Sequence, residues 1–377
     1  MKCKLGEIVD VIMGQSPKSE FYNTEEKGYP FLQGNRTFGL KYPTFDIYTM
    51  VLTKLAKAGD IIMSVRAPVG DLNITPVDMC LGRGVCALRM KNGNQSFLFY
   101  LMKYYVPHLL QKESGTVFGS VNKRDITELE VDIIEDVEKQ KEIARYLEMI
   151  DDKIELNNAI NNNLEQQAQA IFKTEFLSLK ALPSGWRQAS LIDIADYLNG
   201  LAMQKYRPSG NEIGIPVLKI KELRQGCCDN NSELCSPNIK NEYIIHDGDV
   251  IFSWSGSLLV DFWCGGISGL NQHLFKVTSS KYDKWFYYAW TKHHLDHFIY
   301  IATDKATTMG HIKRDELAKA EVFIPNEADY RRIGALLQPI YDLIISNRIE
   351  NKRLALLRDT ILPKLISGKL DTSDIVT

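Results

Sequence analysis

The feature that most constrains the fold is a pattern of apolar residues that occurs twice. Stepping alternately by four and three residues from Ile143 traces an unbroken a/d heptad seam, and the same seam returns at an offset of 190 residues, with Ile333 answering Ile143. Such a seam is typical of a long helix that pairs with another helix. The seams consist of Ile143, Leu147, Ile150, Ile154, Asn157, Asn161, Leu164, Ala168 and Ile171, and of Ile333, Leu337, Ile340, Ile344, Asn347, Asn351, Leu354, Arg358 and Ile361.

Each seam carries two asparagines on its apolar stripe, although asparagine is mildly unfavourable inside helices. A buried polar layer costs stability but penalises shifted registers, because a shift would place amides opposite leucines. We therefore interpret Asn157, Asn161, Asn347 and Asn351 as a register lock. The neighbouring Asn158, Asn162 and Asn163 fall off the stripe, and we expect them to be solvated.

The repeat extends upstream of the seams in the same order of elements. The segment "GSVNKRDI" (119–126) is answered by "GHIKRDEL" (310–317), and "KAGDIIMSV" (57–65) is answered by "HDGDVIFSW" (246–254). Self-similarity at a fixed offset indicates two copies of one module. Each module is predicted to be a globular domain followed by a helix of roughly 40 residues.

Within each domain, Gly-Asp turns precede the apolar runs "IIMS" and "VIFS", which we predict to be strands. One aromatic helix is predicted in each copy, and its helical spacing favours a core position over a base-stacking platform. The domains are therefore expected to be α+β. The predicted boundaries are a first domain at 1–137, a spacer helix at 138–180, a second domain at 181–326, a spacer helix at 327–370 and a tail at 371–377.

Chain connectivity constrains how the two helices pair. The first helix must lead from domain one to domain two, so a second helix that pairs along the same seam has to run back, antiparallel to the first. This pairing returns the C-terminal "LISGKLD" to domain one and relates the domains by a pseudo-twofold axis. A helix of about 40 residues spans about 60 Å, and a turn of B-DNA spans about 34–36 Å. Two non-identical readers on such a spacer would define an asymmetric, gapped DNA sequence.

Composition excludes several classes of protein. The chain has 377 residues, of which 45% are hydrophobic and 24% charged, so it is neither disordered nor fibrous. No apolar run approaches the roughly 20 residues of a membrane span, and the N-terminus lacks the apolar core of a secretion signal. We therefore expect a cytoplasmic protein without a membrane partner. The net charge of -2 offers no support for a nucleic-acid partner, so DNA binding has to rest on local patches.

The cysteines predict neither disulfides nor a metal site. There are seven of them, an odd number without a CxxC pair, which points to a reducing compartment. The potential ligands have spacings that match no standard zinc pattern, so we expect no metal and interpret the thiols as buried or incidental. These residues are Cys227, Cys228, Cys235, Cys264 and His273.

Taken together, the motifs resemble those of the specificity subunits of type I restriction-modification systems. The resemblance covers essentially the whole chain and rests on the ordered, duplicated fragments "LGEIVDVIMGQSP", "GDIIMSVRAPVGD", "GRGVCALRM", "GLNQHLFKV", "QKEIARYLEMIDDKIELN" and "LPKLISGKLD". The resemblance implies two target recognition domains, each reading one half of a bipartite double-stranded DNA site, on an antiparallel coiled coil. It also implies a non-catalytic chain without its own cofactor that docks two methyltransferase subunits. Those subunits bind S-adenosylmethionine and methylate adenine, and ATP-dependent restriction subunits can join the assembly.

The residues themselves agree with a non-enzymatic chain. The sequence contains no GxGxxG, no P-loop GxxxxGK[ST] and no [DN]PP[YF] motif of an adenine methyltransferase. The competing interpretation is a scaffold whose duplicated domains bind protein or small-molecule ligands, and the nearly neutral net charge favours it slightly. A salt-dependent DNA-binding assay separates the two interpretations.

Candidate DNA contacts follow from the chemistry of base edges. Arg matches guanine, and Asn or Gln matches adenine, whereas Lys, Ser and backbone amides more often hold phosphates. Each candidate has the competing interpretation of a solvated loop side chain, "KRD" that of a structural ion pair or turn, and "NQH" that of a satisfied buried cluster. The candidates in domain one are Gln15, Ser16, Lys18, Gln33, Asn35, Arg36, Arg66, Arg83, Lys123 and Arg124. Those in domain two are Gln204, Lys205, Lys219, Lys221, Arg224, Ser255, Gln272, His273, His311, Lys313 and Arg314.

Overall fold

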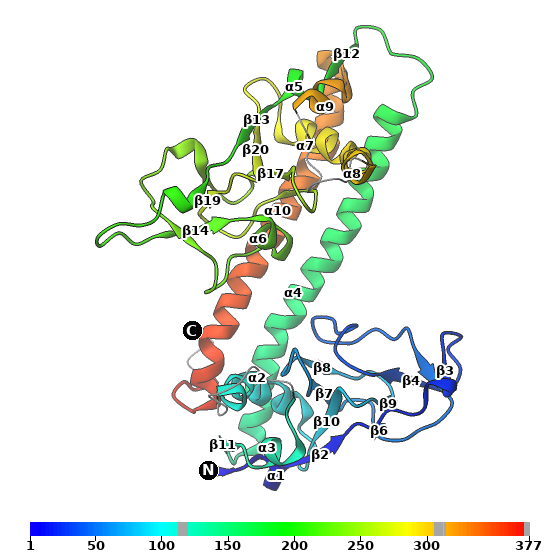
Figure 1. The fold of residues 1–377 in the computed structure, drawn as a ribbon, viewed down its shortest axis with the longest axis vertical. Helices are drawn as coiled ribbons and strands as arrows, with labels where there is room; N and C mark the ends of the chain where they lie inside the picture. Colours follow the sequence, from blue (N-terminus) through cyan, green and yellow to red (C-terminus); the bar gives the residue numbers. More distant parts are fainter. Residues whose placement is uncertain (112–119, 305–311, 313, 373–377) are drawn as a thin grey trace. The chain divides into compact units, whose positions relative to one another are not determined.

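The computed structural model describes residues 1–111, 120–304, 312 and 314–372 (Figure 1). The chain divides into two compact units, each with one globular domain and stretches of both long helices. Unit 1 contains Met1–Asp152 and Ala355–Thr377, and unit 2 contains Lys153–Leu354. The C-terminal stretch thus lies in the same unit as the first domain, which confirms the predicted return of the chain.

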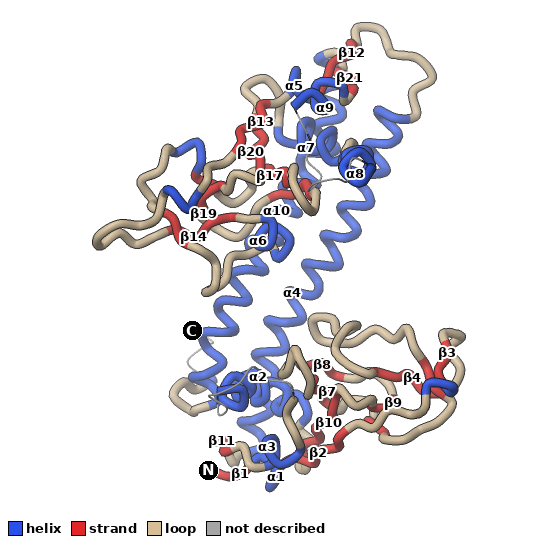
Figure 2. Tube along the Cα trace, viewed as in Figure 1, coloured by secondary structure: helices blue, strands red, loops and turns tan. Residues whose placement is uncertain are grey.

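Unit 1 contains two sheets and a two-stranded ribbon. The first sheet is antiparallel with the order β2-β10-β7-β8, and the second has the order β3-β5-β4-β9-β6, with β4 and β9 parallel. Long loops join the strands of the second sheet (Figure 2). The strands are β1 (Lys2–Lys4), β2 (Val9–Met13), β3 (Tyr22–Asn23), β4 (Tyr29–Leu32), β5 (Tyr48–Thr49), β6 (Leu55–Ala56), β7 (Ile61–Ser64), β8 (Leu72–Ile74), β9 (Met79–Leu81), β10 (Val85–Met90) and β11 (Glu130–Asp132), with β1 pairing β11.

Unit 2 repeats this topology. Its first sheet has the order β13-β20-β17-β18, its second has the order β15-β14-β19-β16 with β14 and β19 parallel, and β12 pairs β21. The repeat predicted from the sequence is therefore confirmed at the level of strand order and direction, except that β3 of unit 1 has no counterpart among the described strands of unit 2. The strands are β12 (Arg187–Ser190), β13 (Asp196–Asn199), β14 (Ile215–Leu218), β15 (Leu234–Cys235), β16 (Ile244–Ile245), β17 (Val250–Ser253), β18 (Leu259–Phe262), β19 (Ser268–Leu270), β20 (Leu274–Thr278) and β21 (Glu321–Ile324).

The predicted Gly-Asp turns do precede buried strands, and the aspartate explains why. The carboxylate of Asp60 accepts a hydrogen bond from the backbone N–H of Lys57 (2.8 Å) and pairs with Arg89 (2.6 Å). In unit 2, Asp249 accepts from the backbone N–H of His246 (2.8 Å) and pairs with a lysine of β20 (2.8 Å). In each copy one side chain thus closes the turn and ties β7 or β17 to its neighbouring strand, with its charge compensated.

The aromatic helices form the cores of their domains. In unit 1, α2 packs against β7, β8 and β10 and buries Phe97, Phe99 and Tyr100. In unit 2, α7 packs against β18 and β20 and buries Trp285 and Trp290. This confirms the core prediction for the aromatic stripes. The shorter helices are α1 (Leu5–Ile8), α2 (Gln95–Gln111), α3 (Lys123–Thr127), α5 (Leu191–Ile194), α6 (Ile220–Gln225), α7 (Lys284–His293), α8 (Leu295–Asp304) and α9 (Arg314–Lys319).

The two long helices are α4 (Val137–Phe172) and α10 (Glu327–Ile366). The first long helix was predicted at 138–180, but its α-helical part ends at Phe172. A π-helical turn, Lys173–Leu177, follows it. Within unit 2, residues of rising number in α4 face residues of falling number in α10, which makes the pair antiparallel as predicted. Within unit 1, Leu147 of α4 shares a core with Ile361 and Leu365 of α10.

The four seam asparagines lie in two facing layers of unit 2. The amide of Asn157 donates to Asn351 (2.8 Å), and that of Asn347 donates to Asn161 (2.9 Å). Asn157 is only 1% exposed. The interpretation of Asn158 as solvated is wrong, since this half-buried side chain accepts a hydrogen bond from Asn351 (2.9 Å). Asn158 follows the seam residue Asn157 directly, and the side chain of Asn351 on the opposite helix reaches it.

The register lock predicts a trade between stability and specificity. Replacing Asn157, Asn161, Asn347 and Asn351 with leucine should raise the melting temperature, because apolar packing replaces the polar layers, and should permit shifted pairings of the helices. Disulfide crosslinking between cysteines placed at facing seam positions reports the register. Asn162→Ala with Asn163→Ala, at exposed positions, is the matched control. Unchanged crosslinks in the leucine variant would contradict the lock.

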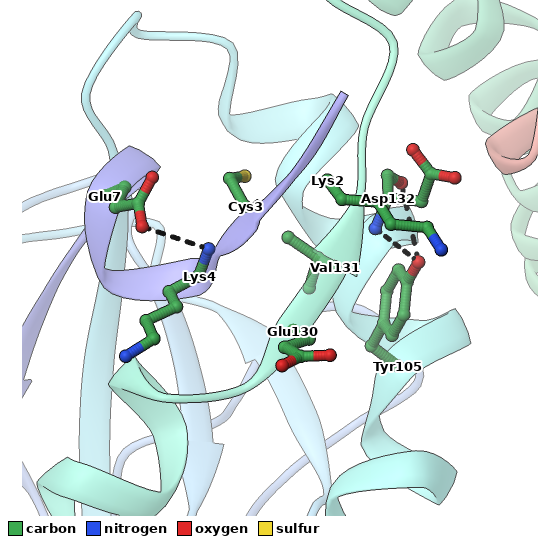
Figure 3. A pocket seen from close by; sticks show the side chains of 8 residues that line it. All are labelled: Lys2, Cys3, Lys4, Glu7, Tyr105, Glu130, Val131 and Asp132. Atoms are coloured by element: carbon green, nitrogen blue, oxygen red, sulfur yellow. Dashed lines mark hydrogen bonds between the residues drawn. The ribbon is translucent and has the colours of Figure 1, made fainter.

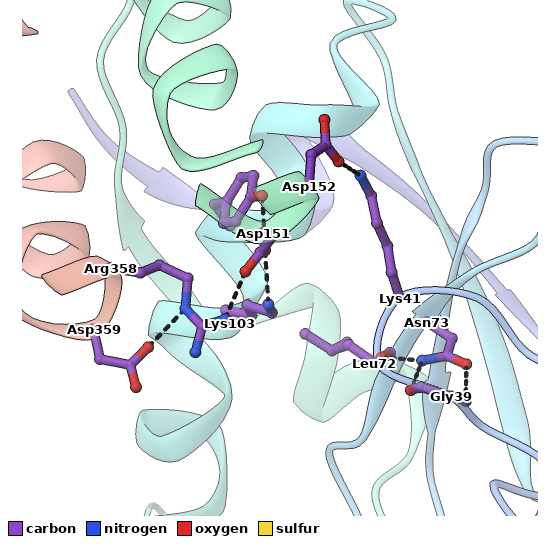
Figure 4. A network of polar contacts seen from close by, with 10 residues as sticks. Gly39, Lys41, Leu72, Asn73, Lys103, Asp151, Asp152, Arg358 and Asp359 are labelled. Carbon is purple, nitrogen blue, oxygen red and sulfur yellow. Dashed lines mark hydrogen bonds and ion pairs between the residues drawn. The ribbon is translucent and has the colours of Figure 1, made fainter. Parts of the chain in front are cut away.

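In unit 1 a polar network ties the first domain to both long helices (Figure 4). Asp151 of α4 accepts from Tyr100 of α2 (2.9 Å) and pairs with Arg358 of α10 (2.6 Å) and Lys103 of α2 (3.3 Å). Burial acts to raise the pKa of Asp151, but the charge of Lys103 and the contacts of Arg358 outweigh it and hold the pKa below its ordinary value. The Asp151 carboxylate is therefore charged at neutral pH.

None of the described helices is long and apolar enough to cross a membrane. Within the described ranges, no three His, Cys, Asp or Glu side chains gather where they would hold a metal ion. Burial raises the pKa of Cys86 to about 12 and that of Cys264 to about 11, so both thiols stay protonated.

Candidate nucleic-acid interface

The candidate residues of domain one gather on a cluster of loops where the two sheets of unit 1 meet. We call residues 14–18, 33–36, 65–71 and 82–84 the first loop cluster. Main-chain hydrogen bonds hold it together: Gly14 N–H donates to Val85 (3.0 Å), Gly82 N–H to Leu32 (2.8 Å), and Gly84 N–H to Gln33 (3.0 Å). The segment after β7 joins the cluster because Val65 N–H donates to Gly84 (2.8 Å). Four segments distant in sequence thus form one surface.

Two glycines permit this close approach. A Cβ on Gly82 would lie 2.6 Å from Cα of Gln33, and a Cβ on Gly84 would lie 2.3 Å from the carbonyl oxygen of Gln33. Since both obstacles are backbone atoms, any larger residue would push the segments apart. The residue between the glycines, Arg83, is consequently presented on a fixed main chain.

Four candidates of the first loop cluster are exposed side chains for which the described part of the chain offers no polar partner. They are Gln15, Gln33, Arg66 and Arg83. An arginine or glutamine without an internal partner keeps all its donors for a ligand. These four are therefore the best placed of the domain-one predictions.

The other candidates of this cluster already have partners. The hydroxyl of Ser16 accepts from Arg83 N–H (3.1 Å), Asn35 donates to Asp71, Arg36 pairs with Asp46, and Lys18 lies 3.7 Å from Glu20. Ser16 and Asn35 thus shape the loops. The Lys18 and Arg36 side chains are more than two thirds exposed, so water competes for their pairs and a phosphate can replace the carboxylate.

Lys123 and Arg124 lie at the start of α3, next to the first loop cluster. Val121 N–H donates to the carbonyl of Val65 (2.9 Å), which brings the start of α3 beside Arg66. Asn122 and Asp125 form a capping box there, so the "KRD" of domain one lies in the first turn of the helix α3. Both basic side chains remain exposed.

Domain two builds a second loop cluster on the same main-chain frame. It comprises residues 200–205, 219, 253–257 and 271–273. Gly200 N–H donates to Leu274 (3.0 Å), Leu201 N–H to Leu270 (2.9 Å), and Asn271 N–H to Leu218 (3.2 Å). They correspond in domain one to the bonds from Gly14 N–H to Val85, from Gln15 N–H to Leu81 and from Gly82 N–H to Leu32.

The basic candidates beside the second cluster are largely neutralised. Lys219 pairs with Glu233 (2.5 Å), and Lys221 pairs with Asp229 (3.0 Å). The hydrogen bond from Lys219, opposed by burial and aided by the charge of Arg207, lowers the pKa of Glu233. The hydrogen bond with Asp229 raises the pKa of Lys221. Because the lysines share their charge with carboxylates, they attract a phosphate less than free lysines would.

Three other candidates of domain two are exposed. Gln204 and Lys205 lie on a short 3-10 turn, Met203–Lys205, and Arg224 lies on the last turn of α6. Arg224 borders a shallow cavity of about 280 Å³ with Ser257, Leu258 and Thr303 among its lining. All three side chains are accessible to a ligand.

The prediction for Ser255 in domain two is wrong, and three further candidates, at the start of α9, stay predictions. Ser255 is 2% exposed, so its hydroxyl is withheld from DNA by packing under the loop. Arg314 donates from its guanidinium to the carbonyl of Tyr197 (3.1 Å), a bond that serves the fold. His311 and Lys313 lie outside the described residues. Sequence alone does not distinguish such residues, because burial and the choice of a hydrogen-bond partner depend on tertiary packing.

The "NQH" segment is neither fully buried nor fully satisfied. Asn271 is 7% exposed and accepts from His273 N–H (3.3 Å). The side chain of Gln272 is half-exposed, and its Nε2 lies 3.3 Å from Nε2 of His273. The Nδ1 atom of His273 is buried without a partner among the described residues. The alternative of a satisfied buried cluster is therefore confirmed for Asn271 alone.

Arg207 is a further basic residue beside the predicted candidates, and it pairs with Glu233 (2.9 Å), which also pairs with Lys219. Its guanidinium is half exposed and adds a cation beside the second loop cluster. The local signal was available in "QKYRPSG", directly after the candidate Lys205. A loop with two basic residues and a proline is a reasonable place for a phosphate contact.

A groove of unit 1 shows no catalytic arrangement among its lining residues. It has a volume of about 520 Å³ and lies along β1 and β11 (Figure 3). Tyr105 accepts from the backbone N–H of Asp132 (2.7 Å), and Lys4 pairs with Glu128 outside the lining. The lining mixes both signs of charge without a nucleophile–base pair: Lys2, Cys3, Lys4, Glu7, Tyr105, Glu130, Val131 and Asp132.

Comparison with protein families gives a match to both copies of the repeat. A family model described as "Type I restriction modification DNA specificity domain" matches residues 1–166 and 183–356. Each matched stretch contains one loop cluster and most of one long helix. The match therefore follows the duplication seen in sequence and topology.

Individual relatives agree with the family match. A chain from Methanocaldococcus jannaschii, provisionally named the type I restriction enzyme MjaX specificity subunit, is 39% identical over 163 residues, which make up 43% of this chain and 38% of that protein. The type I restriction enzyme MjaIX specificity subunit of the same organism is 26% identical over 344 residues, 84% of this chain and 79% of that protein. The solved S subunit of a type I restriction-modification system from M. genitalium shares the fold, with a TM-score of 0.60 at 16% identity over 97% of this chain and 96% of that one.

Proposed function

The chain belongs to the type I restriction-modification DNA specificity family, and from this premise we propose that each of its two domains reads one half of a bipartite, gapped DNA site. Its function is target recognition within a restriction-modification complex, as a subunit that does not itself catalyse the reaction. The observation that carries the proposal is the duplicated loop cluster. Two copies of one main-chain frame display different side chains, as two readers of different sequences would.

The helices supply the spacing in this proposal. An α-helix rises about 1.5 Å per residue, so the 36 residues of α4 carry the chain about 54 Å, more than one turn of B-DNA. A fixed helical register would then fix the gap between half-sites. The asparagine layers support this step, because they oppose sliding of α4 against α10.

The partners in the proposal are double-stranded DNA and two methyltransferase subunits docked on this chain, with ATP-dependent restriction subunits joining where the system has them. S-adenosylmethionine binds to the methyltransferase subunits, and this chain binds no cofactor. The methyltransferase flips the target adenine, since chemistry on a base requires it to leave the stack. The complex acts in the cytoplasm.

Salt dependence of binding tests the proposal against the alternative of a scaffold for proteins or small molecules. The chain is co-expressed with its methyltransferase partner, methylated adenines are mapped, and the complex is titrated with the mapped duplex at several salt concentrations. We expect the logarithm of the binding constant to fall linearly with the logarithm of salt concentration, with a slope of about −0.9 per phosphate contacted. Arg66→Ala should reduce the slope by about 1 if Arg66 holds a phosphate.

A matched control separates contact from general loss of charge. Lys180→Ala removes an exposed cation outside both loop clusters, and it should leave the slope unchanged. A complex that methylates no DNA and binds duplexes with a flat salt dependence would instead support the scaffold.

A further inference from the structure

The two loop clusters share one turn, residue for residue. In domain one, Val85 N–H donates to the carbonyl of Gly82 (3.2 Å), and in domain two Leu274 N–H donates to the carbonyl of Asn271 (3.0 Å). Both turns follow the strand that pairs in parallel with β4 or β14, and both lead into the central strand of the first sheet. The second residue of the turn is Arg83 in one domain and Gln272 in the other.

The frame around the turn is also equivalent. The residue that opens each turn donates its N–H to the end of a neighbouring strand, at Leu32 in domain one (2.8 Å) and at Leu218 in domain two (3.2 Å). In both domains a glycine N–H donates to the carbonyl of the residue that closes the turn. The pairs are Gly14 with Val85 in domain one and Gly200 with Leu274 in domain two. The main chain thus holds the second residue in the same place relative to its own domain. The turns differ in the side chain at this second position and also in the third residue, where Gly84 N–H donates to the carbonyl of Gln33 (3.0 Å) and His273 N–H donates to the side chain of Asn271 (3.3 Å).

The chemistry of these two side chains is complementary to different bases. Arg83 is exposed, and within the described ranges its guanidinium has no partner. Two parallel N–H donors match O6 and N7 of guanine. The carboxamide of Gln272 is half-exposed, and its Nε2 lies 3.3 Å from Nε2 of His273, which leaves a second N–H and the oxygen of the amide for a ligand. One donor beside one acceptor matches N7 and N6 of adenine.

We propose that this turn is the base-selecting position of each domain, with Arg83 reading guanine in one half-site and Gln272 reading adenine in the other. The inference rests on the proposed function and adds which residues choose a base and which base each chooses. The same turn position then selects a base in both domains, and the residue at that position decides which base is selected. The other exposed candidates are then left to hold phosphates or flanking bases.

Reciprocal substitution tests the assignment. Arg83→Gln and Gln272→Arg are each made in the full chain and co-expressed with the methyltransferase partner, and methylated sites are mapped. Arg83→Gln should change one position of one half-site from guanine to adenine, and Gln272→Arg should change one position of the other half-site from adenine to guanine. We expect the preference for the original base to fall roughly ten-fold or more, measured by competition with four duplexes that differ at that position.

The control is Arg124→Gln, which removes an exposed arginine at the start of α3 and should weaken binding to all four duplexes alike. A variant at Arg83 or Gln272 that weakens all four duplexes equally would overturn the assignment and make that residue a phosphate contact. An unchanged mapped site would overturn it as well. Failure of the proposed function is different, because the unaltered complex would then neither methylate DNA nor bind it with a salt-dependent affinity.

Discussion

Replacing Arg348 with methionine is expected to lower the free energy of unfolding of unit 2 by about 2–4 kcal/mol. The guanidinium of Arg348, on α10, pairs with Asp261 of β18 (2.7 Å) and with Glu165 of α4 (2.9 Å). Burial acts to lower the pKa of Arg348, but Asp261 and Glu165 outweigh it and raise the pKa. Methionine keeps the stem but leaves two half-buried carboxylates without their shared cation.

Denaturant unfolding of the complex and of the chain alone measures this effect. Arg353→Met is the matched control, because Arg353 is exposed on the same helix, and it should change the unfolding free energy by less than about 0.5 kcal/mol. Adding Asp261→Asn and Glu165→Gln to Arg348→Met should recover part of the loss, since the unpaired charges disappear. Equal losses for Arg348→Met and Arg353→Met would refute the importance of the network.

The second large effect is expected at Gly14. A Cβ there would lie 2.0 Å from the carbonyl oxygen of Gly82 and 2.7 Å from that of Val85, so Gly14→Ala must displace the main chain of the first loop cluster. We expect a cost of about 2 kcal/mol in the stability of the domain and a loss of ten-fold or more in affinity for the DNA target. Gly200→Ala should do the same in domain two, where the Cβ would lie 2.2 Å from the carbonyl oxygen of Asn271.

The half-site that is affected distinguishes the two variants. Competition with duplexes altered in one half-site should show that Gly14→Ala relaxes discrimination in the half read by domain one, and that Gly200→Ala relaxes it in the other half. Gly34→Ala is the control within the first cluster, because a Cβ there would meet no atom within 4 Å. If Gly34→Ala impaired binding as much as Gly14→Ala, the close approach would not be the cause.

The main features of the fold were predictable from the sequence because they leave periodic or repeated signals. The heptad seams identify the long helices, and the recurrence of Gly-Asp before an apolar run identifies corresponding strands. The order of the sheets was not predicted. Strands β4 and β9 are parallel neighbours separated by four other strands in the sequence, and no local pattern reports such a pairing.

The candidate site was predictable by residue type and only in part by position. Arg66 and Arg83 are exposed as expected, but Ser255 is buried, and the partner of Arg36 is an aspartate ten residues later in the same loop. The choice between a ligand and an internal partner depends on which carboxylates the fold brings near each cation. This is why a chain with a net charge of -2 can still present locally unpaired arginines.

The polar networks that join each domain to the helices are not part of the repeat. Asp151 with Arg358 serves unit 1, and Arg348 with Glu165 serves unit 2. At the seam offset of 190 residues, none of these four charges has a charged counterpart in the other copy. The two halves therefore attach their domains to the helices through different ion pairs, and a domain moved to the other position would meet uncharged residues where it needs an ion partner. The counterparts are Tyr341 for Asp151, Ala168 for Arg358, Asn158 for Arg348 and Ala355 for Glu165.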